Sequence, residues 1–134
     1  MKKIRSILLV EDQPDLLDNL SLTLEMAGYQ TVKAQEGYEA LAALKSQSID
    51  LILSDIAMPD MGGYQLQKLV HETPEWAIIP FLFLTGCRFL SDGEIRYGKA
   101  MGVKAYLTKP IRSEELLAAI RRTLESVQSL ASEP

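Results

Sequence analysis

Apolar, strand-like runs of this sequence stop at polar residues whose side chains could bind a cation and react with phosphorus. The four points are Val10-Glu11-Asp12, Ser54-Asp55, Leu84-Thr85 and Leu107-Thr108-Lys109-Pro110. The carboxyl ends of parallel strands lie at one edge of an α/β sheet, and ligands bind in the crevice outside them. Three carboxylates, one hydroxyl and one ammonium would therefore meet in a single pocket.

The acidic residues of this set suit a hard divalent cation, Mg²⁺ or Mn²⁺. Glu11, Asp12 and Asp55 would provide oxygen ligands from two adjacent strands, and a cation would relieve their mutual repulsion. An aspartate can also attack phosphorus and form an acyl phosphate. The cation and Lys109 would neutralise charge on the transferred group, and Thr85 would donate a hydrogen bond to one of its oxygens.

Each of these residues also has an ordinary structural explanation. Adjacent acids such as Glu11 and Asp12 are common in loops and helix caps, and Asp55 could shape a turn. Thr85 could cap the segment that follows it, and Lys109 could be an exposed lysine before a proline. Their joint occurrence at the carboxyl ends of predicted strands favours a functional site over these separate explanations.

The composition is that of an ordinary globular domain. The chain has 134 residues, 47% of them apolar and 24% charged, which predicts one domain with a substantial core. The net charge of −4 argues against a general nucleic-acid-binding surface, which would be basic. Cys87 is the only cysteine, so an internal disulfide and a cysteine-based zinc site are excluded. A reducing cytoplasm is the simplest setting, since no apolar run suits a signal peptide or a membrane span.

Strand-like and helix-like patterns alternate five times along the chain, which predicts right-handed βαβ crossovers and a parallel sheet. Strands are expected at residues 7–10, 31–34, 51–53, 78–84 and 103–107. Helices are expected from Pro14 through Ala27 to a stop at Gly28, over residues 37–46, around Leu66 and Val70, over 92–101 with an interruption at Gly98, and after an N-cap at Ser113. We predict one domain over residues 3–127, with 128–134 as a tail or the start of a linker.

The sequence resembles the receiver domain of bacterial two-component response regulators over nearly its full length. The matching segments are Ile7-Leu8-Leu9-Val10-Glu11-Asp12, Asp55-Ile56-Ala57-Met58-Pro59-Asp60-Met61-Gly62-Gly63, Phe83-Leu84-Thr85-Gly86 and Gly102-Val103-Lys104-Ala105-Tyr106-Leu107-Thr108-Lys109-Pro110. This resemblance implies a doubly wound, flavodoxin-like (βα)₅ fold. Its five-stranded parallel sheet would have the order 2-1-3-4-5, with two helices on one face and three on the other. The implied function is a phosphorylation-dependent signalling switch and not a conventional enzyme.

The resemblance also implies which residues accept the phosphoryl group and hold the metal. Asp55 would be the phosphoacceptor, taking the group from a phosphohistidine of a sensor histidine kinase or a phosphotransfer protein. Asp12 and Asp55 would ligate Mg²⁺ together with the backbone carbonyl of Ala57, and Glu11 would act through a water.

The phosphate-binding and switch residues that the resemblance implies are Thr85, Gly86, Tyr106 and Lys109. Lys109 would pair with the phosphate, Thr85 would swing toward it, and Tyr106 would turn from an outward to an inward rotamer. The family commonly has alanine at the position of Gly86. Because glycine has no side chain, it would keep access to the phosphoryl group open here. Ala57 and Cys87 would flank the path of the hydrolytic water, and because both are small we expect a short-lived phosphoryl group.

Two other functions remain open at this point. A phosphorylation-independent receiver-like interaction module would predict the loss of at least one pocket residue. A phosphatase with an aspartyl-phosphate intermediate commonly has a second acid two residues after its nucleophile, where this chain has Ala57. A signalling switch could act on an output domain or a target protein. It could also form a homodimer through the fourth helix, fifth strand and fifth helix. Direct binding to nucleic acid or to a membrane is not expected.

Overall fold

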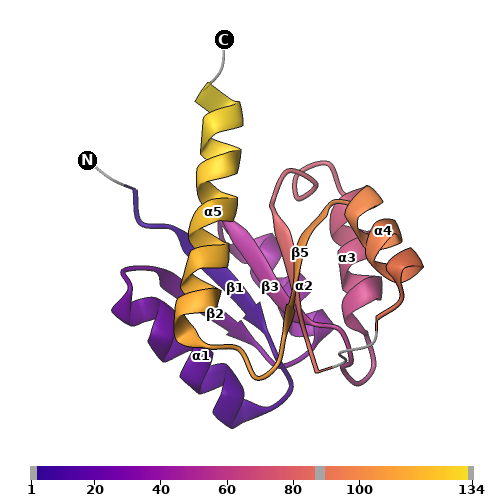
Figure 1. The fold of residues 1–134 in the computed structure, drawn as a ribbon, viewed down its shortest axis with the longest axis horizontal. Helices are drawn as coiled ribbons and strands as arrows, with labels where there is room; N and C mark the ends of the chain where they lie inside the picture. Colours follow the sequence, from indigo (N-terminus) through magenta and orange to yellow (C-terminus); the bar gives the residue numbers. More distant parts are fainter. Residues whose placement is uncertain (1–2, 87–89, 133–134) are drawn as a thin grey trace.

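The protein forms alternating strands and helices in the computed structural model, which describes residues 3–86 and 90–132, with side chains to residue 127. The elements are β1 (Ser6–Val10), α1 (Pro14–Met26), β2 (Gln30–Ala34), α2 (Gly37–Ser46), β3 (Leu51–Asp55), α3 (Gly63–Glu72), β4 (Phe81–Thr85), α4 (Asp92–Ala100), β5 (Val103–Thr108) and α5 (Ser113–Ser132). Figure 1 shows the helices arranged around a central sheet, with α5 extending past its edge.

The sheet has five parallel strands in the order β2-β1-β3-β4-β5. This confirms the predicted flavodoxin-like topology. At the centre, β1 lies beside β3, and Val10 is in register with Ser54. Every residue of β3 and β4 is buried, as expected for strands that helices cover on both faces. The acidic residues that follow β1 and end β3 are therefore brought to the same edge.

The core consists of two buried clusters, one on each face of the sheet. Leu24 of α1 and Ile120 of α5 belong to one cluster, and Leu66 of α3 belongs to the other, together with residues of α2. Neighbouring residues of β4 serve opposite faces, because Leu82 lies in the first cluster and Phe83 in the second. Figure 1 places α4 beside α3, which gives the expected arrangement of two helices and three.

The fourth strand begins later than the sequence predicts. Residues 78–80 were expected in the strand, but β4 starts at Phe81, and Ile78 is 83% exposed. Successive turns precede it, with the amide of Trp76 donating to the Thr73 carbonyl and that of Ile79 to the Trp76 carbonyl, each at 2.9 Å. These bonds satisfy the backbone locally, so the apolar pattern at this point does not extend the strand.

Three helix boundaries and one predicted interruption differ from the predictions. Ser113 is the first residue of α5 and not its N-cap, because the Arg112 carbonyl already accepts a hydrogen bond from the Leu116 amide at 3.0 Å. Ala27 caps α1 and is exposed, while Gly28 has φ of 101° and ends the helix as predicted. Gly98 does not interrupt α4, which ends at Ala100, one residue before the predicted end.

The fifth helix also continues past the predicted domain boundary. α5 runs to Ser132, so residues 128–132 extend the last helix. The boundary at residue 127 itself stays a prediction. No helix among the described residues is long and apolar enough to cross a membrane.

Candidate functional site

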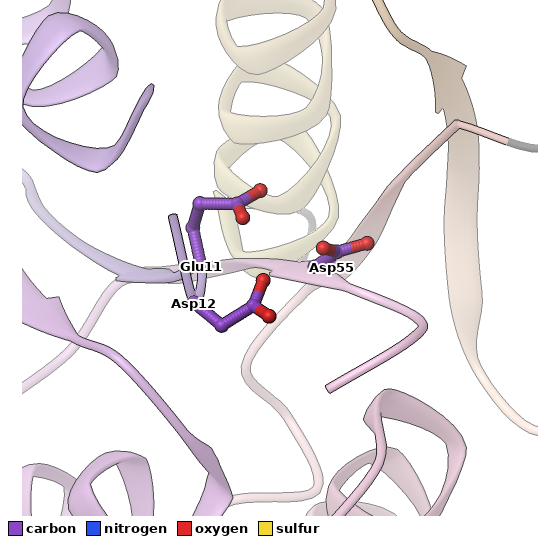
Figure 2. A group of neighbouring side chains, drawn as sticks. All are labelled: Glu11, Asp12 and Asp55. Carbon is purple, nitrogen blue, oxygen red and sulfur yellow. The ribbon is translucent and has the colours of Figure 1, made fainter. Parts of the chain in front are cut away.

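Three carboxylates converge where β1 and β3 end. Glu11 and Asp12 directly follow β1, and Asp55 is the last residue of β3. One carboxylate oxygen from each lies within 4.8 Å of the others. Figure 2 shows the Asp12 carboxylate directed toward Asp55, with Glu11 alongside. Glu11 is 1% exposed and Asp55 7% exposed, whereas Asp12 is open to solvent.

Lys109 enters this cluster from the end of β5. Its Nζ lies 2.7 Å from Glu11 Oε1 and 3.1 Å from Asp55 Oδ2. Its backbone amide donates to the Thr85 carbonyl at 2.8 Å, which links the ends of β5 and β4. A single ammonium thus contacts two buried carboxylates, and the predicted meeting of acidic and basic groups is present in the fold.

The electrostatics of the pocket favour proton uptake. Burial raises the pKa of Glu11, and this outweighs the lowering effect of Lys109 and of a hydrogen bond from the Gln13 amide. Burial alone would lower the pKa of Lys109, but its bonds to Glu11 and Asp55 raise that pKa above its usual value. Lys109 is therefore a permanent cation at neutral pH, while Glu11 holds its charge at a penalty.

The oxygen donors of the pocket fit a hard divalent cation. Glu11 Oε1 is buried and accepts no well-aligned hydrogen bond from the described residues, although Lys109 Nζ forms an ion pair with it. Three carboxylates share one ammonium in this pocket, so negative charge is in excess, and a divalent cation near them would balance it. Ala57 is exposed in the loop that follows β3, two residues after Asp55, which is the last residue of that strand.

A close backbone turn holds the loop after β3 against Asp55. The Gly63 amide donates to the Ile56 carbonyl at 2.7 Å. A Cβ on Gly63 would lie 2.3 Å from the Asp55 carbonyl oxygen and 2.8 Å from the Ile56 Cα, so a side chain cannot be accommodated. In the sequence, Gly63 is the last residue of a motif, and no pattern there predicts its close approach to the Asp55 backbone.

The other predicted site residues come from β4, the residue that follows it, and β5. Thr85 is buried at the end of β4. Gly86 is exposed, and a Cβ there would meet no atom of the described residues within 4 Å, which agrees with an open approach. Tyr106 lies farther along β5, where its ring packs at 5.5 Å from that of Phe83. Cys87 and its two successors lie outside the described residues, so the prediction about the hydrolytic water stays a prediction.

The fold and the pocket together define a class, that of flavodoxin-like α/β domains with an acidic pocket and a lysine at the carboxyl edge of the sheet. Residues 7–121 match the response regulator receiver domain. The chain belongs to this family of two-component signalling domains.

Known proteins of the family resemble this chain over most of its length. Protein PilH of Pseudomonas aeruginosa is 34% identical, covering 88% of this chain and 96% of PilH. The chemotaxis response regulator CheY4 of Vibrio cholerae has a TM-score of 0.82 at 34% identity, with 90% of this chain and 98% of that one covered. A CheY-like receiver domain from Methanospirillum hungatei has a TM-score of 0.86 at 28% identity, covering 95% of this chain and 98% of that one.

Other relatives are longer than this chain. The transcriptional regulator RpaA of Synechocystis is 36% identical over 88% of this chain, which spans only 48% of RpaA. Both stand-alone domains and larger regulators thus carry this fold.

Proposed function

We propose that this protein is a signalling switch that accepts a phosphoryl group on Asp55 and presents an altered surface as a result. The observation that carries the proposal is the contact of Lys109 with Asp55, 3.1 Å away, inside a pocket that also holds Glu11 and Asp12. Such a pocket can ionise a nucleophile and neutralise the charge of an incoming phosphoryl group.

The reaction would be an exchange of one bond to phosphorus for another. A carboxylate oxygen of Asp55 attacks phosphorus, and the phosphorus–nitrogen bond of a partner's phosphohistidine breaks. The electron pair goes to the imidazole nitrogen, which takes up a proton. A bound Mg²⁺ or Mn²⁺ would neutralise charge on the phosphoryl oxygens. Asp12, Asp55 and the Ala57 carbonyl would hold it, and Glu11 would hold one of its waters.

The remaining residues of the chain would hold the phosphoryl group and transmit its arrival. Lys109 would turn from the carboxylates toward the phosphate, and Thr85 would donate a hydrogen bond to it. Tyr106 would then change its position against α4. The open approach at Gly86 and the small, exposed Ala57 support a short-lived phosphoryl group, because little obstructs a hydrolytic water.

The phosphodonor would be a sensor histidine kinase or a phosphotransfer protein. An apolar cleft of about 510 Å³ lies beside Lys109 and is lined by Leu16 and Leu20 of α1 and by Ile111 and Leu116 near the start of α5. A helical partner that seats its apolar face there would bring a phosphohistidine to the pocket. An output domain, a target protein or a second copy bound at α4, β5 and α5 would read the result.

The test is the intact mass of the protein after incubation with acetyl phosphate or phosphoramidate, with Mg²⁺ and with EDTA. We expect one phosphoryl adduct that requires Mg²⁺ and is lost in Asp55→Asn. Asp60→Asn is the matched control, because Asp60 is exposed in the same loop, and its φ of 64° is one that asparagine also adopts. This control should retain the adduct.

Two results would contradict the proposal. An adduct that persists in Asp55→Asn would place the phosphoryl group elsewhere. No adduct from small donors or from a phosphorylated histidine partner would favour a phosphorylation-independent interaction module.

A further inference from the structure

The fourth helix is attached to the rest of the protein in an unusual way. A surface helix normally docks through a stripe of apolar side chains. In α4, Gly98 is the one buried residue, and Ile95 is only partly buried. A glycine contributes no side chain to a core, so the packing at Gly98 comes from the residue that lies against it.

That residue is Tyr106 of β5. A Cβ on Gly98 would lie 1.8 Å from the Tyr106 hydroxyl oxygen and 2.8 Å from its Cζ. The hydroxyl also donates to the Glu94 carbonyl of α4, at the long distance of 3.4 Å. The phenol therefore occupies the space that any side chain at position 98 would need. We call this space beside Gly98, which the Tyr106 ring fills, the receptacle.

The opposite wall of this space is aromatic. The Tyr64 ring of α3 meets Phe83 edge-on at 5.0 Å, and Phe83 contacts Tyr106. The Tyr64 hydroxyl is buried and has no hydrogen-bond partner among the described residues. Burial and the neighbouring Tyr64 raise the pKa of Tyr106 well above its usual value, which agrees with a half-buried phenol.

We propose that Tyr106 is the anchor that docks α4 on the sheet, and that Gly98 is the positioning residue that admits this anchor. When the ring leaves the receptacle, α4 loses its main attachment along its length. Its C-terminal end stays tethered, because Gln67 of α3 donates to the carbonyl of the C-cap residue Met101 at 2.5 Å. The consequence for signalling rests on the proposed function: a phosphorylation-driven movement of Tyr106 would act on a partner by docking or releasing α4.

The first test is a double-mutant cycle on the equilibrium of unfolding in urea, with Gly98→Ala, Tyr106→Ala and the double variant. Gly93→Ala is the matched control, because Gly93 lies in the same helix and a Cβ there would meet only Ser91 Oγ, at 3.8 Å. We expect Gly93→Ala to raise the folding equilibrium constant about threefold, as alanine commonly does in helices. Gly98→Ala should lower that constant roughly tenfold through overpacking.

In the Tyr106→Ala background the effect of Gly98→Ala should change sign. With the ring absent, the added methyl group meets open space, and alanine should again raise the folding equilibrium constant about threefold. If Gly98→Ala raises stability equally with and without Tyr106, the receptacle does not exist and the proposal fails.

The second test follows the ring and the helix directly. In protein labelled with fluorotyrosine, Gly98→Ala should move the Tyr106 fluorine resonance toward that of a solvent-exposed tyrosine, with Tyr106→Phe to assign it. Amide hydrogen exchange in α4 should accelerate roughly tenfold or more in Tyr106→Ala, while exchange in α1 changes little. Unchanged amide hydrogen exchange in α4 of a folded Tyr106→Ala protein would contradict the proposal that Tyr106 anchors this helix. Neither test uses phosphorylation, so a failure here is distinguishable from a failure of the proposed function.

Discussion

The positive charge of Lys109 offsets the repulsion between the buried carboxylates of Glu11 and Asp55. Its contacts with Glu11 and Asp55, at 2.7 and 3.1 Å, are shielded, since the lysine side chain is only 20% exposed. Such pairs contribute little net stability when intact, but the loss of one member leaves a buried charge unpaired. The chemistry of the site and the stability of the fold therefore depend on the same residue.

We expect Lys109→Met to lower the free energy of unfolding in EDTA by about 1–3 kcal/mol, somewhat less than for a fully buried pair. Since the pKa of Lys109 is raised in the fold, its stabilisation is fully present below the unfolded value of 10.5 and is lost as the pH rises past it. Urea unfolding at neutral pH measures the change.

The control for this prediction is Lys104→Met, because Lys104 is exposed on β5, the strand that Lys109 directly follows. Mg²⁺ should restore stability to Lys109→Met by about 2.7 kcal/mol at a hundredfold excess over its dissociation constant. Equal losses in the two variants would show that Lys109 does not act through the carboxylates.

At the scale of elements, α1 and β2 are joined by a small polar network outside the pocket. Ser21 of α1 and Thr31 of β2 both donate to Glu25 Oε1, at 3.0 and 2.8 Å, and their two hydroxyls lie 2.6 Å apart. β2 lies at one edge of the sheet and pairs with β1. The network therefore connects this edge strand to the helix that precedes it.

This network predicts a pH dependence of a known sign. The hydrogen bonds from Thr31 and Ser21 lower the pKa of Glu25 below its usual value of 4.5. Its contribution is therefore present above pH 4.5 and is lost as the pH falls through the lower, folded value. The stability difference between the parent protein and Glu25→Gln should shrink on acidification, because a neutral amide accepts these bonds less strongly.

Unfolding in urea from neutral pH to below 4.5 tests this. Glu72→Gln, at an exposed carboxylate at the end of α3, serves as the comparison. A gap between the parent and Glu25→Gln that stays constant across this range would mean that the network does not depend on the charge of Glu25.

At the scale of the whole molecule, one sheet separates two clusters of core residues and makes each depend on the other. Ile120 of α5 lies fully buried in one cluster, while Trp76 packs against the other cluster, on the far face. Since alternate residues of each strand serve opposite faces, loss of packing on one side should propagate through the strands to the other.

We expect Ile120→Val to lower the free energy of unfolding by about 1 kcal/mol. Trp76 fluorescence should report the same shift of the urea midpoint as far-ultraviolet circular dichroism, because a domain of this size unfolds as one unit. The single tryptophan of the chain makes the assignment of the signal unambiguous. Separate midpoints for the two probes would show that the faces unfold independently.

The sequence alone determined the alternation of elements, the parallel sheet and the residues that converge at its carboxyl edge. Local patterns predict this, because an apolar run such as Leu51–Leu53 with Asp55 two residues later is typical of a buried strand that ends at a charged group. The predicted start of β4 was wrong by three residues, because the strand begins at Phe81. Backbone amides in the turns around Trp76 form local hydrogen bonds, although the apolar pattern predicts sheet pairing for the segment that follows.

Only the tertiary structure decided which groups touch. The sequence suggested Lys109 as a phosphate ligand, but its pairing with both Glu11 and Asp55 depends on strands that lie far apart in the chain. Gly98 looked like an interruption of a helix, and the fold turned it into the space that Tyr106 fills. A glycine has no side chain that could contribute to a sequence pattern, so its packing role depends on the residue that the fold places beside it.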